Sequence, residues 1–462
     1  MAEPSTMKTS ILAVDVRKIG RLEAIANTND LLDDFEIELD DTTPDARNLK
    51  KAACQLRSSS TAVAFPTETV YGLGGDATRS ESVQSIFRAK ARPADNPLIV
   101  HFASLKLLRD ILSVGRQQNS VVKSDSDHDP IPAIYHSLIR KFWPGPLTII
   151  LPNPAQSPLA TEVTAGLSTF GARMPGHILA LALINLANVP IAAPSANAST
   201  KPSPTAAEHV MYDLNGRIET IIDGGPCDVG VESTVVDGLS DPPLILRPGG
   251  ISIEQLRECP GWSNVQIGYK NVAENGSKPV APGMKYRHYS PKANVILLEA
   301  GSGPPSMSEL EQYAGSQSRL GLIRTKRWHL DIKDEVTPIS LAPLQPHVSG
   351  TNFGHDETHH QGFARLLATL QSVKEPRKAL RKYELLTGSS TLSLFDISLG
   401  PSTPDIARGI FAALRELDSQ GVHSIIVEGI YDGEGDCAAA IMNRLRKASE
   451  IKIASCEQGQ KG

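Results

Sequence analysis

Short apolar runs of β type alternate with turn signals along the first half of the chain. The runs that we predict as strands are 62–65, 98–102, 147–151, 191–193, 221–223, 234–237 and 244–247. Stretches with helical periodicity fall between them, at 46–57, 80–89 and 178–187. This alternation predicts an α/β domain built on one twisted sheet with flanking helices.

A second alternation of the same kind fills the C-terminal part of the chain. Its strand-like runs are 295–299, 320–323, 392–398 and 424–427. The segment 405–418 places its apolar side chains on one helical face, as a helix packed on a parallel sheet requires: Ile406, Ile410, Ala413, Leu414 and Leu417. We therefore predict a second, smaller doubly wound domain.

Polar, turn-rich stretches separate these parts. We divide the chain into an N-terminal extension 1–44, a first domain 45–262, a linker 263–291 and a C-terminal domain 292–462. Two further polar stretches, 117–129 and 347–361, are typical of solvated loops. The histidines of the second stretch leave metal binding as a weaker alternative.

Composition narrows the functional classes. The chain has 46 Lys and Arg against 51 Asp and Glu, and this net charge of −5 argues against a surface with general affinity for nucleic acid. The 5 cysteines are scattered without CxxC spacing, so neither a disulfide framework nor a zinc site is expected. No apolar run approaches the roughly 20 residues of a transmembrane helix. The expected location is the cytosol, and an alternative start at Met7 leaves a mitochondrial fraction open.

Two clusters around the first strands carry candidate chemistry. The segment 65–75, FPTETVYGLGG, crowds hydroxyls, a carboxylate and glycines into a turn, which suits a small polar ligand or only a tight connection. It lacks the GxxxxGK[ST] pattern of a Walker-type loop. The cations Arg88, Lys90 and Arg92 precede the next strand and suit a polyphosphate, with a solvated helix end as the plainer alternative.

Two polar segments follow farther along. Alternation along 168–175 places Thr169, Gly171 and Arg173 on one face, where Arg173 could clamp a carboxylate. The run 193–204 is rich in hydroxyls and amides that suit hydrogen bonds to a nucleotide or phosphate. Read alone, this run is an ordinary polar loop.

Later polar groups follow or interrupt β-type runs, where α/β scaffolds carry their site residues. Ser233 and Arg247 are the candidates there, and the linker centre 285–289, KYRHY, offers cationic and stacking groups for a nucleotide. No Ser-His-Asp, Cys-His or HExxH pattern stands out. Neither covalent catalysis nor a metal site is therefore expected.

Taken together, these motifs resemble one family. PTETVYGLG, KARPADNPLIVH, STFGARMP, APSANAS, VESTVV, LRPGG and PGMKYRHYSP resemble the YrdC-like domain of threonylcarbamoyl-AMP synthases. The second half, with GDCAAAIMNRLRKAS, resembles the extra domain of the two-domain members, so that the resemblance covers 46–454. It implies a YrdC-like twisted mixed sheet with flanking helices, followed by a smaller Rossmann-like doubly wound domain.

The resemblance implies a nucleotidyltransferase. Bicarbonate would carboxylate the amine of L-threonine, and the carbamate would attack the α-phosphorus of ATP with release of pyrophosphate. Such chemistry needs positioning and charge neutralisation more than a protein nucleophile, and Mg²⁺ on the phosphates would complete the neutralisation. The product, L-threonylcarbamoyladenylate, would go to the tRNA threonylcarbamoyl transferase machinery, which forms threonylcarbamoyladenosine beside the anticodon of ANN-decoding tRNAs. Contact with tRNA would be indirect, and no membrane is implied.

The resemblance also implies site residues. The threonine pocket would comprise Thr69, His101, Arg173, Ala193 and Ser233. Lys90 and Arg92 would be catalytic, through their charge. ATP would bind to Arg92, Asn96, Thr169, Ser195, Asn197, Ser203, Arg247, Tyr286 and His288. The linker would fold back over the active site and exclude water.

Some features leave other interpretations or departures from the family. A YrdC-like surface could bind RNA without catalysis, which steep salt dependence would reveal. Hydrogenase-maturation carbamoyltransferases are a second, weaker alternative, because their acylphosphatase and zinc-finger parts are absent here. Ala91 stands where many relatives have glycine, and Gly409 interrupts a helix at an expected cost of roughly 1 kcal/mol.

Overall fold

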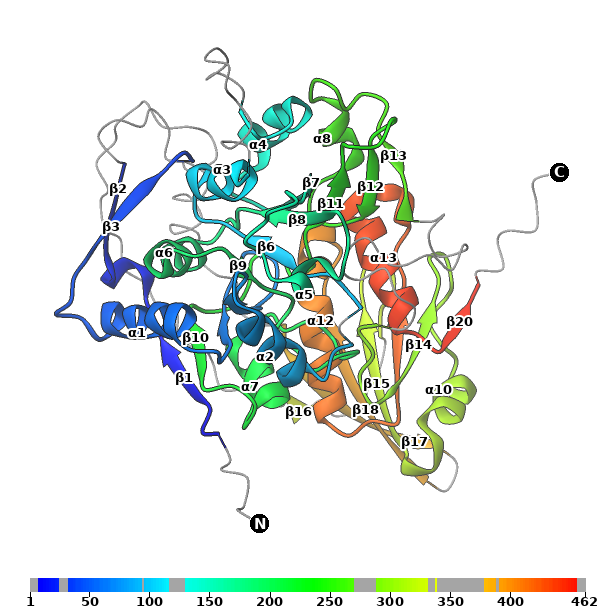
Figure 1. Cartoon of the computed structure of the whole chain (residues 1–462). Coiled ribbons are helices and arrows are strands. Elements are labelled where there is room, and N and C mark those ends of the chain that lie inside the picture. The colour runs from blue at the N-terminus through cyan, green and yellow to red at the C-terminus, as the bar shows by residue number, and fades with distance from the viewer. Residues whose placement is uncertain are drawn as a thin grey trace.

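The computed structural model describes residues 7–24, 32–93, 95–115, 129–269, 288–330, 337–338, 378–387 and 390–454. Three sequence predictions lie outside these residues: the polar stretch 117–129 apart from Asp129, the stretch 347–361, and residues 285–287 of the linker centre, with Tyr286. The two predicted α/β parts are present as two large sheets (Figure 1).

The first part is built on a mixed sheet of eleven strands in the order β1-β10-β4-β5-β9-β6-β8-β7-β11-β12-β13. The strands are β1 Ser10–Ala13, β4 Val63–Phe65, β5 Gly72–Asp76, β6 Ile99–His101, β7 Leu147–Pro152, β8 Thr169–Arg173, β9 Ile191–Ala192, β10 Thr220–Asp223, β11 Thr234–Asp237, β12 Leu244–Arg247 and β13 Gln266–Ile267. Strand β6 runs parallel to β8 and antiparallel to β9. The predicted mixed sheet is confirmed.

Helices flank this sheet. They are α1 Pro44–Ser58, α2 Ser80–Lys90, α3 Leu105–Ser113, α4 His136–Phe142, α5 Thr161–Thr164, α6 Ile178–Ala187, α7 Ala207–Leu214 and α8 Ile253–Arg257. Helix α6 is apolar almost all round and is buried nearly throughout, with α1 packed beside it. Helix α1 begins where Thr43 accepts a hydrogen bond from the Ala46 amide and Pro44 occupies the first turn.

The segment assigned to the N-terminal extension contributes to this sheet. Strand β1 pairs in parallel with β10, while β2 Gly20–Ala24 and β3 Phe35–Leu39 form a separate two-stranded sheet. The sequence alone predicts no strand at β1, because SILA is too short to show a period. The domain boundaries themselves stay predictions.

The second part has a seven-stranded sheet in the order β16-β17-β18-β15-β19-β14-β20. Its strands are β14 Asn294–Leu298, β15 Arg319–Arg324, β16 Thr337–Pro338, β17 Leu380–Thr387, β18 Ser390–Ser398, β19 Ser424–Glu428 and β20 Ile451–Ile453. Neighbours from β18 to β20 are parallel, whereas β16, β17 and β18 are antiparallel. This is the smaller Rossmann-like domain that the sequence predicts.

Helices cover both faces of the second sheet. Alternation sends Val295 and Leu297 of β14 toward α12 Thr403–Ser419 and α13 Asp436–Ala448. Ile296 and Leu298 face the opposite side, with α10 Met307–Ala314. Helices α12 and α13 lie between this sheet and the first part (Figure 1). Contacts between the two parts therefore run through these two helices.

One carboxylate lies at the carboxyl ends of the parallel strands of the second sheet. Glu428, the last residue of β19, accepts hydrogen bonds from the Thr325 and Arg327 amides at 2.6 Å each, and from the Trp328 amide at 3.2 Å. Its side chain is held by backbone donors that follow β15. Buried backbone donors need such partners, so Glu428 stabilises this turn.

Two departures from the family pattern have local explanations. Ala91 ends α2 in a left-handed conformation with φ 50°, which glycine adopts with less strain. Gly409 lies inside α12, and a Cβ atom there would approach Leu399 Cδ2 to 2.6 Å. The lower helix propensity of Gly409 thus accompanies a close contact between α12 and the residue after β18.

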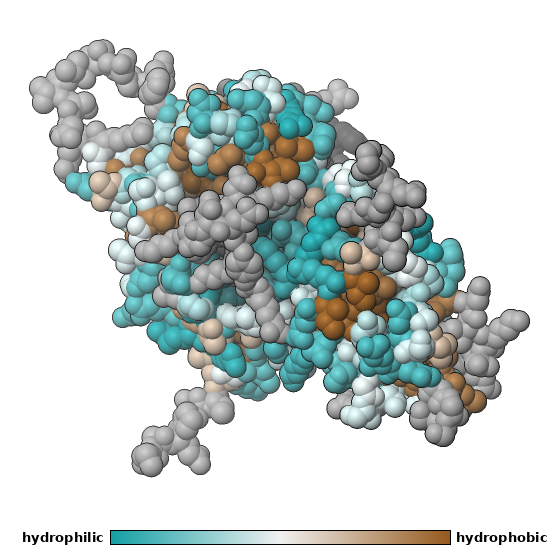
Figure 2. All heavy atoms as spheres, turned by 90° about the vertical axis from the view of Figure 1, so that its right-hand side faces the viewer, coloured by the Kyte–Doolittle hydropathy of each residue, from teal (hydrophilic) through white to brown (hydrophobic). Residues whose placement is uncertain are grey.

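The face that Figure 2 shows is mostly hydrophilic, with apolar side chains gathered in two areas. Among the residues that the structure describes, none of the helices has the length and apolar character needed to cross a membrane.

Candidate active site

One pocket collects residues from several sequence motifs. Its empty space of about 560 Å³ includes solvent at the open mouth. It is lined by Thr67, Thr69, Val70, Gly72, Arg92, Ile99, His101, Arg173, Ala193, Pro194, Ser195, Glu232, Arg247, His288 and Tyr289. Strand ends and the turns that follow them supply most of this lining.

The turn before β5 is tightened by its own hydroxyl groups. Thr67 Oγ1 donates to the Val70 carbonyl at 2.6 Å and accepts from the Thr69 amide at 3.2 Å. These local bonds are the usual way in which threonine shapes a turn. They present the Thr69 hydroxyl to the pocket.

Arg173 brings a buried positive charge to this turn. It ends β8, in register with His101 on β6. Its Nη2 atom donates to Thr69 Oγ1 at 2.9 Å and lies 2.7 Å from Glu68 Oε1. Arg173 is 4% exposed, so its interaction with an entering carboxylate would be only weakly screened by water. The predicted carboxylate clamp therefore has a suitable geometry.

His101 is neutral in this environment. Burial, followed by the charge of Arg173, lowers the pKa of His101 to about 3. Its Nδ1 atom is buried and has no hydrogen-bond partner among the described residues. The ring packs edge-on against Phe65, with 6.5 Å between centroids. A neutral imidazole can both accept and donate one hydrogen bond.

Cations and amides form the other side of the pocket. Arg92 Nη2 donates to the Pro97 carbonyl at 3.2 Å, and burial lowers the pKa of Arg92 to about 10. Arg92 Nε and Asn96 Oδ1 are buried polar atoms for which the described residues supply no hydrogen-bond partner. Asn96 itself is outside the pocket lining, adjacent to Pro97. These atoms can take part in ligand binding.

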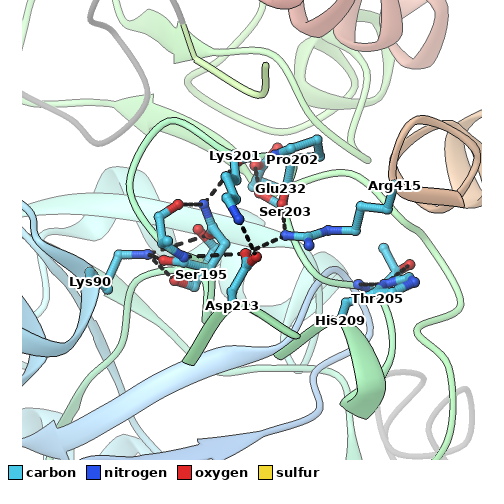
Figure 3. A network of polar contacts seen from close by, with 12 residues as sticks. Lys90, Ser195, Lys201, Pro202, Ser203, Thr205, His209, Asp213, Glu232 and Arg415 are labelled. Atoms are coloured by element: carbon cyan, nitrogen blue, oxygen red, sulfur yellow. Dashed lines mark hydrogen bonds and ion pairs between the residues drawn. The ribbon is translucent and has the colours of Figure 1, made fainter. Parts of the chain in front are cut away.

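Lys90 lies behind the pocket lining. Its ammonium group donates to the carbonyl of Ser195 and, at 2.6 Å, to the carbonyl of Asn197 (Figure 3). Burial is the main reason why the pKa of Lys90 is well below its usual range. In this conformation Lys90 holds the loop after β9, whose residues Ala193, Pro194 and Ser195 line the pocket.

Four other predicted residues lie outside the pocket lining: Thr169, Asn197, Ser203 and Ser233. Ser233 is fully buried, and its hydroxyl accepts a hydrogen bond from Arg247 Nη2 at 2.9 Å. Arg247 lines the pocket, so Ser233 acts on it from behind. Thr169 begins β8 and Arg173 ends it, so although they share a face they are separated by roughly 13 Å of strand.

Glu232 is a pocket residue that the sequence analysis did not select. Its Oε1 atom accepts from Ser203 Oγ at 2.6 Å, and its Oε2 atom accepts from Arg444 Nε at 3.0 Å. In the VESTVV motif the polar residue predicted for the site is its neighbour Ser233. Glu232 could not be selected from sequence because its arginine partner is 212 residues away. Tyr289, part of the KYRHY linker centre, also lines the pocket beside His288.

Comparison with known proteins assigns the family. The model described as Telomere recombination matches residues 56–249, and the model described as Threonylcarbamoyl-AMP synthase, C-terminal domain, matches 251–450. The threonylcarbamoyl-AMP synthase of Schizosaccharomyces pombe is 42% identical, covering 96% of this chain and 98% of the relative. That of Bacillus subtilis is 45% identical, covering 90% and 96%. This chain belongs to the threonylcarbamoyl-AMP synthase family.

A solved structure agrees with this assignment. Pyrococcus abyssi Sua5 complexed with L-threonine matches with a TM-score of 0.62 and 33% identity, covering 96% of this chain and 99% of that chain. The family and the two-domain fold predicted from the sequence are thus confirmed. As a synthase of nucleotidyltransferase type, the chain is an enzyme, and the RNA-binding alternative is disfavoured.

The synthase pocket does not supply a ligand set for a resident metal ion. No group of three or more His, Cys, Asp or Glu side chains suited to a metal occurs in the described part of the chain. Glu232 is the carboxylate in the pocket lining, and both its oxygens already accept hydrogen bonds.

Proposed function

We propose that this chain converts L-threonine, bicarbonate and ATP to L-threonylcarbamoyladenylate, pyrophosphate and water. The threonine nitrogen bonds to the carbon of bicarbonate, and water leaves to give a carbamate. A carbamate oxygen then bonds to the α-phosphorus of ATP as the bond to pyrophosphate breaks. One observation carries the proposal: a single pocket holds Arg173 beside Thr69 and also contains the guanidinium groups of Arg92 and Arg247.

The proposed threonine site lies around Arg173. Its guanidinium group would bind the substrate carboxylate, for which arginine has a matching planar geometry. Thr69 and the neutral His101 would contact the remaining polar groups of threonine, beside the backbone of Ala193. Ser233 would act indirectly, by holding Arg247.

The proposed ATP site lies toward Arg92 and Arg247. Their charges would neutralise the triphosphate and stabilise the charge that moves to pyrophosphate. The ATP-binding roles predicted for Asn96, Thr169, Ser195, Asn197, Ser203, Tyr286 and His288 form part of this proposal. Lys90, predicted to be catalytic, would support the phosphate site by fixing the Ser195–Asn197 backbone.

The proposed product is a reactive adenylate with a tRNA modification as its destination. We infer that it passes to the tRNA threonylcarbamoyl transferase machinery for ANN-decoding tRNAs, so that contact with tRNA is indirect. The proposed location is the cytosol, with a mitochondrial fraction. Mg²⁺ would enter with ATP.

Pyrophosphate release from ATP and bicarbonate, measured with each amino acid in turn, tests the proposal. Release should depend on threonine. Arg173→Ala should lower kcat/KM for threonine by about 10- to 100-fold, since a hydrogen bond to a charged group contributes roughly 1.5–3 kcal/mol. Arg173→Lys, which keeps the charge opposite Glu68, checks that a loss is not caused by unfolding.

Arg109→Ala is the matched control, because Arg109 forms ion pairs with Asp33 and Asp129 outside the pocket lining. It should leave threonine-dependent release unchanged. If no amino acid stimulates pyrophosphate release by folded protein, the synthase proposal is overturned. RNA binding that weakens steeply with salt would then favour the alternative function.

A further inference from the structure

The C-terminal domain inserts an arginine beside the proposed ATP site. Arg444 lies on α13 and is 1% exposed. Its Nη1 atom donates to the Pro248 carbonyl at 2.6 Å, next to Arg247, and its Nε atom donates to Glu232 Oε2 at 3.0 Å. One side chain of the second domain thus contacts two neighbouring segments of the first.

Glu232 continues this contact into the pocket. Glu232 lines the pocket. Besides the hydrogen bond from Arg444, it accepts one from Ser203, which lies in the loop after β9. Figure 3 shows Glu232 and Ser203 on one side of this loop and Lys90 reaching Ser195 on the other. A chain of direct contacts therefore runs from Arg444 through Glu232 to the proposed ATP-binding loop.

Charge gives this contact a consequence for nucleotide binding. The positive charges of Arg444 and Arg247, with the Ser203 hydrogen bond, outweigh burial and lower the pKa of Glu232 to about 2. A carboxylate in the pocket is therefore ionised and would repel a triphosphate. Because Arg444 is buried beside it, the repulsion is offset where solvent screening is weak.

The threonine side of the pocket has a separate set of contacts. Arg173 is held by Thr69, Glu68 and, at 3.4 Å, the Gly145 carbonyl. None of these three contacts involves Arg444 or Glu232. A substitution of Arg444 should therefore alter the affinity for ATP and leave the affinity for threonine nearly unchanged.

We propose that Arg444 is a positioning residue, supplied by the C-terminal domain, that sets the affinity for ATP by neutralising and orienting Glu232. This inference rests on the proposed function, since it assumes that ATP occupies the cationic side of the pocket. It gives α13 a role in nucleotide binding without direct contact between Arg444 and the nucleotide.

The experiment compares Arg444→Met, Glu232→Gln, the double variant and Arg446→Met in the full chain. Arg446 is the matched control because it lies on the same helix and binds Glu299 and Asp432 within the C-terminal domain. The Kd of an ATP analogue with a non-cleavable α–β bond and the Kd of threonine alone are measured by calorimetry, and KM and kcat by pyrophosphate release. The use of direct binding separates this inference from catalysis.

Arg444→Met should weaken analogue binding and raise KM for ATP about 10-fold or more, the effect expected for an uncompensated buried charge. The Kd of threonine should change less than about twofold, and Arg446→Met should change neither. Adding Glu232→Gln to Arg444→Met should recover most of the lost affinity, since the unpaired carboxylate is then gone. The double variant also guards against failure to fold.

Equal weakening of threonine and analogue binding in Arg444→Met would reduce Arg444 to a structural residue and overturn the inference. Unchanged analogue binding would overturn it as well. If the wild type binds the analogue but shows no threonine-dependent release, the proposed function fails, while the comparison of analogue affinities still decides the role of Arg444.

Discussion

At the scale of single residues, burial keeps three histidines neutral. Burial is the main cause that lowers the pKa of His101 and of His209 to about 3, with Arg173 and Arg415 adding to the effect. The pKa of His288 falls to about 4, again mainly through burial. All three rings are thus uncharged at neutral pH. His209 uses its Nδ1 atom to accept a hydrogen bond from the Thr205 amide at 3.2 Å.

These histidines predict acid sensitivity. An unfolded histidine titrates near 6.5, so between about pH 6.5 and pH 4 the unfolded chain binds protons that the folded chain does not. Each such group lowers the free energy of unfolding by up to about 1.4 kcal/mol per pH unit as the pH falls through this window. Chemical denaturation at pH 7 and pH 5 measures this slope.

His209→Gln provides the control for this prediction, since glutamine can still accept from the Thr205 amide but cannot become protonated. Its slope between pH 7 and pH 5 should be shallower than that of the wild type. An identical slope would mean that His209 does not titrate differently in the folded and unfolded chains.

The sequence was sufficient to predict site residues whose motifs lie on paired strands. Arg173 and His101 come from motifs whose strands pair in register, and both line the pocket. Glu232 escaped selection because its role depends on Arg444 from the other domain. For Lys90 and Ser233, the motifs correctly indicated that the residues lie near the pocket. That their side chains lie behind the pocket lining depends on packing, which the sequence does not show. Which of these residues contact substrate stays a prediction.

At the scale of elements, a glycine turn sets how closely α12 approaches the first domain. Gly230 has φ 80°, and a Cβ atom there would lie 2.3 Å from Arg408 Cα. Beside this contact, Arg408 Nε donates to the Asp228 carbonyl at 3.0 Å. The turn can therefore accept only a residue without a side chain.

Gly230→Ala should lower the free energy of unfolding by roughly 2–5 kcal/mol, from left-handed strain plus overpacking against α12. Gly166→Ala is the matched control, because Gly166 has φ 79° and no atom within 4 Å of its virtual Cβ. It should show only the strain, about 1–2 kcal/mol. Thermal and denaturant unfolding measure both; equal losses would show that the contact with α12 yields readily.

Elements with a clear period were predictable, and those defined by pairing were not. The bounds of α6 match the prediction, because its apolar residues, flanked by polar and turn residues, define it locally. Strand β1 has four residues and is a strand only through its pairing with β10. Strand β17 was likewise not predicted, since its polar residues obscure the apolar alternation that β18 completes.

At the scale of the whole molecule, buried ion pairs join the two domains. Arg415 on α12 reaches Asp213 on α7 with 2.7 Å between Nη2 and Oδ2, and both side chains are nearly inaccessible (Figure 3). The pair between Arg444 and Glu232 is similarly buried. Opening the interface would deprive the two buried arginines and Glu232 of these ion partners, so we expect the domains to unfold together.

Arg415→Met should therefore lower the free energy of unfolding of the full chain by roughly 1.5–3 kcal/mol, the contribution of a hydrogen bond to a charged group, because Lys201 would still pair with Asp213. Lys106→Met is the exposed counterpart: Lys106 is 66% exposed and lies 3.9 Å from Asp110, so its removal should cost less than about 1 kcal/mol. Denaturant titration provides both values. Equal, small losses would indicate that the interface does not depend on the Arg415 pair.

The carboxylate of Glu428 affects what can bind at the end of the second sheet. Rossmann-like sheets usually receive ligands where their parallel strands end, yet here the amides of Thr325, Arg327 and Trp328 already hold an anion that belongs to the chain. A phosphate that binds here would have to displace the Glu428 carboxylate, which is part of the chain and therefore always present at the site. The end of this sheet is thus occupied by a carboxylate of the chain itself, while helices α12 and α13 face the pocket-bearing domain.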